Sequence, residues 1–444
     1  MEKRVEVTAT EDMRSSINEY GKEEVMERMF RKVIGAGVIC FFSTLVLLTG
    51  FSFEAMGADT VKIGHLDPFS GPFESLGRTW TAGLRFAVDE QNAKGGLLGK
   101  KVEIIAEDNE GKPDVATRKA NKLILENKVN FITNGFGSHN AIALNKVATA
   151  QKTIYINYAA MSDPVMGPEF SPYAFRVCQN VSASNTGMIL YLATKPYRKF
   201  YFINPDYAAG HDNDKVNREQ LKLHIPDAQI IGGDFPPLSN RDYAPYITKI
   251  IAAKPDAILT GLHSTDLINF TKQARAMGIK APFPICAPLG KHPYIINELK
   301  DAAVGIHWSV EYSLRVKTPE NEEMIRRYHE KHKDDKDFLT QWPFADCSMA
   351  IMGWKMTFAA VEKAGSLDPQ KIIEAFEGFQ WKSPVGMWTM RKCDHQVLLP
   401  MFGGVIEAGP NPFYKFPWAG PNIVEFPAEK VAKPATPDYN PRCK

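Results

Sequence analysis

Short apolar runs alternate with longer amphipathic stretches from residue 61 onward. The run 61–66 predicts a strand. The stretch 79–93 predicts a helix, because Trp80 and Leu84 recur on one face at helical spacing. Further strands are expected at 102–108, 129–133 and 153–157, with helices at 113–127 and 139–150. Strands that alternate with helices favour βαβ units and a mostly parallel sheet, so the predicted fold class is α/β.

The same alternation restarts after residue 181. Strands are expected at 199–204, 228–235, 256–261, 283–288 and 304–310, with helices up to about 223, over 243–253 and from 264. Three helical stretches then follow without strands of their own, at 319–333, 345–364 and 368–378. These late helices must cover a sheet already made, so the chain is expected to cross back to the first unit. Beyond residue 404 the chain is Pro-rich and polar, and we expect an irregular tail.

The composition is that of an ordinary globular protein. The 444 residues are 44% hydrophobic and 23% charged, enough for two or three domains. The formal net charge of +2 argues against a nucleic-acid partner.

The N-terminus, residues 1–58, differs from the rest. Residues 33–53 carry no charge, and Arg31 and Lys32 precede them. With the small residues of 55–59 as a cleavage region, this predicts a secretory signal. The apolar run is also long enough for a membrane anchor, and a polar leader of 28 residues precedes Met29. We favour a cleaved signal over an uncleaved anchor, and either places the body outside the cytoplasm.

The loops that follow the predicted strands are the candidate binding regions, because ligands of open parallel sheets bind beyond the carboxyl ends of strands. In the loop 133–140, Ser138 lies near a helix N-terminus, and Gly137 lets the backbone approach a ligand closely. His139 adjoins it. In the loop 157–164, Ser162 and the N–H group of Ala160 could contact the same ligand. For both serines, simple helix capping is the alternative.

The remaining loops add charge and aromatic surface. Asp266 begins a predicted helix and could oppose a ligand ammonium, or only favour the helix dipole. The aromatic residues of these loops could together line a small pocket; they are Phe69, Phe73, Tyr158, Tyr207 and Trp342.

Motifs of catalysis do not appear. The string around Ser138 is not GxSxG, and no GxxxxGK[ST] phosphate loop occurs. The histidines are scattered, so we expect no metal site, no cofactor and no enzymatic activity. The cysteines of the body, Cys178, Cys286, Cys347, Cys393 and Cys443, lack metal spacing, and their disulfide pairing is open.

Three segments together resemble a known family. They are SGPFESLG (70–77), the stretch 83–124 and the stretch 255–283. The marks are the SGP loop, a helix ending in N-x-x-GG-x-x-G and the D-x-x-x-x-P that opens the next helix. Over roughly 60–405 the chain resembles type I periplasmic solute-binding proteins, closest to the leucine/isoleucine/valine-binding branch.

The resemblance implies two Rossmann-like lobes joined by three hinge strands, which close over a small solute. The lobes would be 60–180 with 312–384 and 181–311 with 385–410, followed by the tail 411–444. It also implies a periplasmic receptor of an ABC importer, with a permease in the inner membrane as its partner. A membrane-anchored ligand sensor is the alternative.

The family's ligand roles map onto individual positions. The carboxylate grip falls on Ser138 or Gly137 with Ala160 and Ser162, and the acid that meets an ammonium falls on Asp266. The family's aromatic of the loop 203–210 falls on Ala209 without a gap, which makes Tyr207 a substitute. Its aromatic of the SGP loop falls on Leu76. These departures leave the ligand open between an amino acid and an aromatic or other organic acid.

Overall fold

The computed structural model describes residues 60–444, and the segment 33–53 with its predicted signal or anchor lies outside them. The first sheet is parallel, with strand order β2-β1-β3-β4-β5. Its strands are β1 (Val61–Asp67), β2 (Val102–Asp108), β3 (Phe131–Asn134), β4 (Ile154–Asn157) and β5 (Ala174–Arg176). The connecting helices are α2 (Glu74–Ala93), α3 (Pro113–Leu125) and α4 (Ser138–Gln151). The predicted βαβ pattern is confirmed here.

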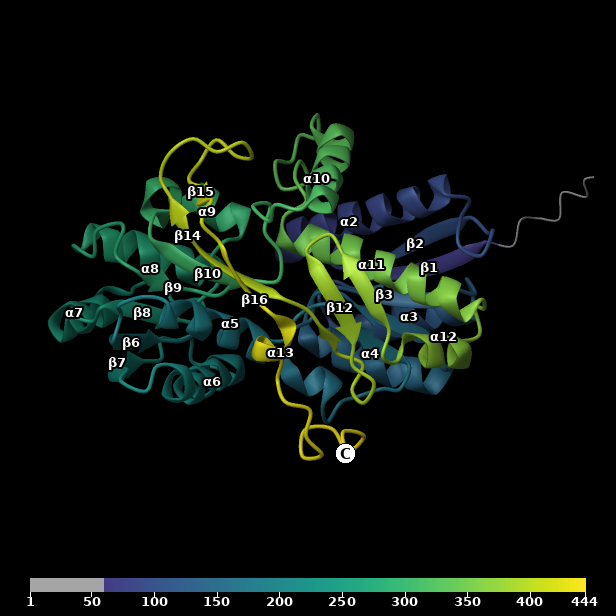
Figure 1. Ribbon diagram of the computed structural model, residues 1–444, viewed down its shortest axis with the longest axis horizontal. Coiled ribbons are helices and arrows are strands. Elements are labelled where there is room, and N and C mark those ends of the chain that lie inside the picture. Colours follow the sequence, from purple (N-terminus) through teal and green to yellow (C-terminus); the bar gives the residue numbers. More distant parts are fainter. Residues whose placement is uncertain (1–59) are drawn as a thin grey trace, which may run out of the picture. The chain divides into compact units, whose positions relative to one another are not determined.

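Helices cover both faces of this sheet (Figure 1). Phe131 packs in one hydrophobic core with Trp80 of α2, whereas its neighbour Ile132 packs in a second core with Leu144 of α4. Successive strand residues point to opposite faces, and all four residues of β3 are buried, so this strand is covered on both sides.

The second sheet has strand order β15-β14-β10-β9-β8-β6-β7. Its parallel strands are β6 (Lys199–Ile203), β7 (Gln229–Asp234), β8 (Ala257–Thr260), β9 (Ile285–Cys286) and β10 (Ile306–Val310). Its helices are α5 (Val181–Ala193), α6 (Ala208–His224), α7 (Ala244–Ala253), α8 (Ser264–Ala276) and α9 (Pro293–Leu299). Strand β14 (Met401–Glu407) joins β10 in the antiparallel sense.

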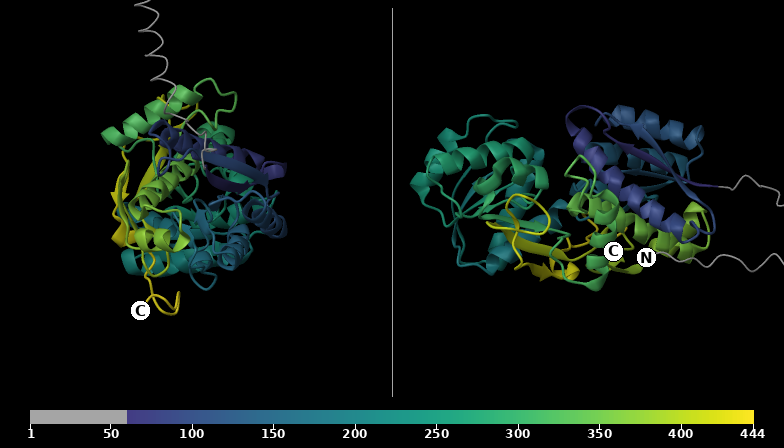
Figure 2. Two further views of the ribbon diagram at one scale, coloured as in Figure 1. Left: turned by 90° about the vertical axis from the view of Figure 1, so that its right-hand side faces the viewer. Right: turned by 90° about the horizontal axis from the view of Figure 1, so that it is seen from above.

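The late helices return to the first sheet, as expected. They are α10 (Pro319–His332), α11 (Ala345–Ala364) and α12 (Pro369–Phe376). Helix α11 packs along α2, and α10 is joined to α2 by an ion pair between Arg327 and Glu90, with 2.6 Å between Nη1 and Oε1. Figure 2 shows these green helices beside the purple α2.

A small third sheet corrects one expected boundary. It contains β11 (Gln380–Ser383), β12 (Gly386–Met390) and β13 (Val397–Leu398). The turn that follows β12 contacts the first sheet, because Arg176 N donates to His395 O at 2.9 Å and Phe175 stacks on the His395 ring. The chain therefore crosses to the second sheet at β14, later than the boundary expected at residue 385.

The C-terminal segment 411–444 is not irregular throughout, which corrects a second expectation. It forms β15 (Trp418–Ala419), β16 (Val424–Phe426) and α13 (Ala428–Val431). Both short strands pair with β14, so they satisfy the backbone groups of a strand that would otherwise have an open edge. Strands of two or three residues are too short to show a periodicity in the sequence.

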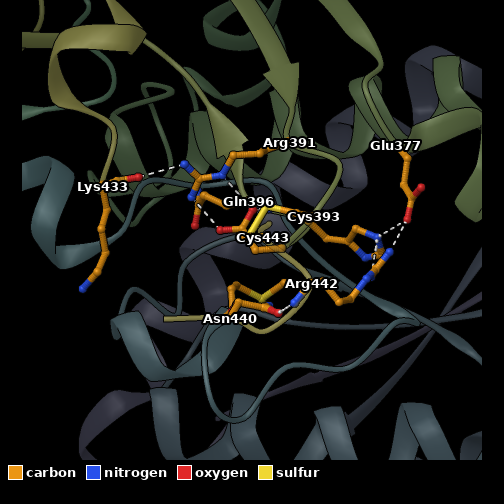
Figure 3. Close-up of a disulfide and its surroundings, with 11 residues drawn as sticks. Glu377, Arg391, Cys393, Gln396, Lys433, Asn440, Arg442 and Cys443 are labelled. Carbon is orange, nitrogen blue, oxygen red and sulfur yellow. Dashed lines mark hydrogen bonds and ion pairs between the residues drawn. A yellow bond between two sulfur atoms is a disulfide. The ribbon is translucent and has the colours of Figure 1, made fainter. Parts of the chain in front are cut away.

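The end of the chain is tied back to the first lobe. Cys393 and Cys443 form a disulfide with an S–S distance of 2.07 Å, which answers the open pairing (Figure 3). Cys178, Cys286 and Cys347 are buried free thiols. None of the helices between residues 60 and 444 is both long and apolar enough to span a bilayer.

Candidate ligand-binding cleft

A cavity of about 630 Å³ lies between the loops of the two sheets. The first sheet contributes the loops after β3 and β4, and the second contributes the loops after β6, β8 and β9. Its lining includes Gly137, Ser138, Ala160, Ser162, Tyr207, Leu262 and His263. Five of the residues predicted from the sequence therefore meet around one cavity, at the carboxyl ends of strands.

The N-terminus of α4 opens onto this cavity. Gly137 is the N-cap residue with φ of +83°, and Ser138 is the first helical residue. The first-turn N–H groups of a helix have no intrahelical partner, and together with the helix dipole they favour an anion. Since Gly137 and Ser138 line the cavity, this helix end presents to it groups that can bind an anion.

The Ser138 hydroxyl links the two loops of the first sheet. Its Oγ accepts a hydrogen bond from Ser162 N at 3.1 Å. Neither serine caps a helix with its side chain, so the capping alternative is wrong for both. The hydroxyl proton of Ser138 stays available for a ligand oxygen.

The backbone N–H groups expected from the second loop are already engaged. Ala160 N donates to Asn157 Oδ1 at 2.8 Å, and Ser162 N donates to Ser138. Arg176, which is fully buried, donates from Nη1 to Ser162 O at 2.6 Å. These bonds make the loop a rigid wall of the cavity, which corrects its expected role as a backbone donor to the ligand.

The tail also reaches the cavity, which the sequence did not predict. Lys433 lines the cavity and donates from Nζ to Asp163 Oδ2 at 2.7 Å. The same carboxylate oxygen accepts the hydroxyl of Ser182 at the start of α5. A segment expected to be an irregular tail thus places a cation beside the connection between the two sheets.

The second sheet contributes an aromatic and an imidazole. Tyr207 OH lies 3.2 Å from His263 Nε2, and both side chains are half-buried at the cavity. Burial raises the pKa of Tyr207 and lowers that of His263, although Asp266 acts in the opposite direction on the histidine. At neutral pH the pair is therefore uncharged and suits a hydrogen-bonding rather than an ionic contact.

An inner compartment of about 240 Å³ continues from this cavity. The two share Gly137, Ala159, Met161, His263 and Leu289. Apolar and aromatic side chains form much of its wall, namely Leu76, Trp80, Phe136, Tyr294, Ile295 and Phe344, and Gln179, Lys291, Glu311 and Asp346 add polar groups. A solute held at α4 can therefore extend its apolar part inward.

The architecture and cleft have counterparts among known proteins. A sequence profile of the Periplasmic binding protein family matches residues 60–410. The chain belongs to this family. Leu/Ile/Val-binding protein homolog 4 of Brucella melitensis is 26% identical over 385 residues, covering 82% of this chain and 87% of the relative, which agrees with the leucine/isoleucine/valine-binding branch.

Two solved structures of periplasmic binding proteins share the fold. The solute binding protein of an ABC transporter from Rhodopseudomonas palustris BisB5, in complex with 3,4-dihydroxybenzoic acid, is 26% identical, with a TM-score of 0.70 over 83% of this chain and 98% of its own. The leucine-, isoleucine-, valine-, threonine- and alanine-binding protein of Brucella ovis, in a closed conformation, is 22% identical, with a TM-score of 0.75 over 87% and 99%. These relatives are solute receptors rather than enzymes, and family membership implies an extracytoplasmic location.

Three predicted residues of this periplasmic binding protein lie away from the cavity lining. Tyr158 is fully buried, and its hydroxyl bonds to Asp67. His139 is exposed and bonds to a backbone carbonyl of the preceding loop. Phe73 packs on Phe136 with 4.3 Å between the ring centroids. We assign none of the three a direct ligand contact, because each already has a protein partner.

Asp266 is also placed away from the cavity, which corrects its expected pairing with a ligand ammonium. Its Oδ2 accepts a hydrogen bond from Ser239 N at 3.0 Å, and only 5% of the residue is exposed. Because Asp266 lies in the first turn of α8, the sequence predicted a charge at the cleft, but the side chain points toward the loop before α7. Lys291 and Glu311 line the inner compartment but were not predicted from the sequence, because they belong to no recognisable motif.

Proposed function

We propose that this chain is the periplasmic solute receptor of an ABC importer, with an inner-membrane permease as its partner. It binds a small carboxylate between its two lobes and closes over it by a hinge motion. One lobe is built on the first sheet with α10–α12, and the other on the second sheet. A ligand shifts the balance toward the closed form only by binding that form more tightly.

The observation that carries the proposal is the cavity between the two sets of loops. An anion-binding helix end faces it from one lobe, and the Tyr207–His263 pair faces it from the other. A ligand that contacts both lobes is more fully enclosed when they approach, so binding and closure are coupled. The cavity lining offers fixed donors and apolar surface, which reversible binding requires.

Two ligand classes fit these groups: amino acids and aromatic carboxylic acids. The first is supported by the Leu/Ile/Val-binding homologue, and the second by the relative that holds 3,4-dihydroxybenzoic acid. Both carry a carboxylate for the N-terminus of α4 and an apolar body for the inner compartment.

Calorimetric titration of the full chain, expressed with its leader, tests the function. We expect at least one member of a panel of amino acids and benzoates to bind in a 1:1 ratio and to raise the melting temperature. No binding across the panel, or conversion of a bound compound to product, would contradict a carboxylate receptor.

Mass spectrometry of the exported protein separates the receptor from the membrane-anchored sensor. A periplasmic product that begins near residues 58–59 is expected for the receptor. Retention of the uncleaved chain in the membrane would favour the sensor.

A further inference from the structure

The inner compartment contains buried acceptors that lack protein partners. Glu311 is 2% exposed and Gln179 is 5% exposed, and both line the compartment. Within residues 60–444, neither Oε2 of Glu311 nor Oε1 of Gln179 has a hydrogen-bond partner. Buried polar groups are nearly always paired, since an unpaired one loses its hydration without compensation. Two such acceptors in one cavity wall indicate a place for a donor.

Lys291, the cation that lines the same compartment, is committed elsewhere. Lys291 Nζ donates to Tyr312 O at 2.5 Å and lies 4.2 Å from the centre of the Trp308 ring. Its ammonium therefore has two partners of its own, although Glu311 stabilises its charge. Lys291 thus supports the ionised form of Glu311 without occupying its free oxygen.

A second acid–base pair lies in the same wall. His292 Nε2 is 2.9 Å from Asp346 Oδ2, so this carboxylate has an imidazole beside it. Burial raises the pKa of Glu311 and lowers that of Lys291, because each charged form is poorly solvated in the compartment. A donor that contacts Glu311 would replace part of the lost solvation.

The walls between the two polar ends are apolar. Trp80, Phe136 and Phe344 line the inner compartment, and Gly137 belongs to both compartments. A carboxylate at the N-terminus of α4 thus has a path along aromatic surface to Glu311. Such a ligand is a small amphipathic molecule with polar groups at both ends.

We propose that Glu311 and Gln179 form an acceptor subsite that receives an N–H or O–H donor at the end of the ligand remote from its carboxylate. This inference rests on the proposed function and narrows its ligand class. The favoured solutes are carboxylates with an apolar or aromatic body and a hydroxyl or ammonium group. Glu311 takes the counter-charge role that the sequence assigned to Asp266.

Matched ligand pairs test the subsite in the full chain. We would titrate benzoate against 4-hydroxybenzoate, and 4-methylbenzoate against 4-(aminomethyl)benzoate, by calorimetry, because both donors then lie at the end remote from the carboxylate. In at least one pair, the donor-bearing member should bind about tenfold more tightly or better, as expected for a hydrogen bond to a charged group. The hydroxyl pair and the ammonium pair show which donor the subsite takes.

Substitution then assigns the preference to a residue. Glu311→Gln removes the charge and should lower the affinity of the preferred donor-bearing ligand about tenfold, while the plain acid of that pair changes little. Asp266→Asn is the matched control, because it alters another buried carboxylate of the second lobe that does not line the cleft. The melting temperature without ligand checks that both variants fold.

The outcomes separate the subsite from the receptor function. Equal affinity within both pairs, or an unchanged preference in Glu311→Gln, overturns the subsite and leaves the carboxylate receptor standing. Absence of binding by all four acids overturns the subsite, whereas the receptor function is contradicted only if the whole panel of amino acids and benzoates fails to bind.

Discussion

Gly137 determines how α4 meets the cleft. Its φ of +83° lies in a region that side chains disfavour, and a Cβ there would be 2.8 Å from His139 Cε1. The resulting turn brings the first-turn N–H groups and the Ser138 hydroxyl to the cavity. The proposed anion recognition at this place thus depends on one backbone conformation and one hydroxyl.

The first residue-scale prediction concerns that hydroxyl. Ser138→Ala removes a donor to the ligand carboxylate and the acceptor of Ser162 N. We expect carboxylate affinity to fall by roughly 1.5–3 kcal/mol, the range for hydrogen bonds to charged groups. Calorimetry measures the loss, and Ser138→Thr, which keeps a hydroxyl, should restore part of it. An unchanged affinity in Ser138→Ala would return the residue to a purely structural role.

The second residue-scale prediction concerns pH. His307 lies buried in β10, and burial, with a smaller effect of Lys195, lowers its pKa to about 4. In the unfolded chain a histidine has a pKa of about 6.5, so between these values the unfolded state binds more protons. The free energy of unfolding should therefore fall as pH drops from about 6.5 toward 4.

Denaturant titrations at several pH values measure this dependence. His307→Gln should flatten it relative to the unchanged protein, because glutamine does not titrate. Other histidines are common to both proteins and cancel in the comparison. Parallel pH profiles would show that His307 is not responsible.

At the scale of elements, close packing explains how the late helices rejoin the first sheet. A Cβ on Gly83 of α2 would lie 2.3 Å from Cys347 O of α11, so the two helices meet at a glycine. The small residue allows the backbones to approach, and the side chains around it then fill one core. The same core continues into α5 of the second lobe, through residues such as Met188 and Leu192.

The element-scale prediction concerns the disulfide that holds the tail. Cys393 and Cys443 are 50 residues apart in sequence, and chain-entropy arguments give a stabilisation of about 4 kcal/mol for a loop of that length. The variant Cys393→Ser/Cys443→Ser should lose an amount of this order in guanidinium unfolding. Reductant should lower the free energy of unfolding of the unmodified protein toward that of the variant, and it should leave the value for the variant unchanged. If reductant destabilised both proteins equally, the Cys393–Cys443 disulfide would not be the source of the stabilisation.

At the scale of the whole described chain, four segments connect the two sheets. Three join β5 to α5, β10 to α10 and β13 to β14. The fourth is the tail, which leaves β16 and ends at the disulfide beside Arg391 and Arg442 (Figure 3). It passes the cleft at Lys433. The proposed hinge closure must therefore accommodate a fourth connection.

The whole-molecule prediction is ligand-dependent compaction. Small-angle scattering should show a smaller radius of gyration when a bound carboxylate is saturating, because the ligand favours the closed arrangement of lobes. The variant Cys393→Ser/Cys443→Ser tests the contribution of the tail. Freeing the tail should change the radius of gyration of the ligand-free protein more than that of the ligand-bound protein. Identical scattering with and without ligand would contradict hinge closure.

The sequence by itself determined the α/β class, the order of the main strands and helices, and the loops that form the cleft. These follow from local periodicity and from the rule that ligands bind beyond parallel strands. It missed α5, which is buried on nearly all sides and so lacks an apolar stripe, and it missed the two- and three-residue strands of the tail.

Only the tertiary structure decided which side chains reach the cavity. Asp266 and Glu311 are both acidic residues beside a strand end, yet one turns to a neighbouring loop and the other lines the compartment. Side-chain direction, and contacts between residues as distant as Asp163 and Lys433, depend on how whole elements pack. No local sequence pattern encodes these side-chain directions and contacts, because the residues involved lie far apart in the chain.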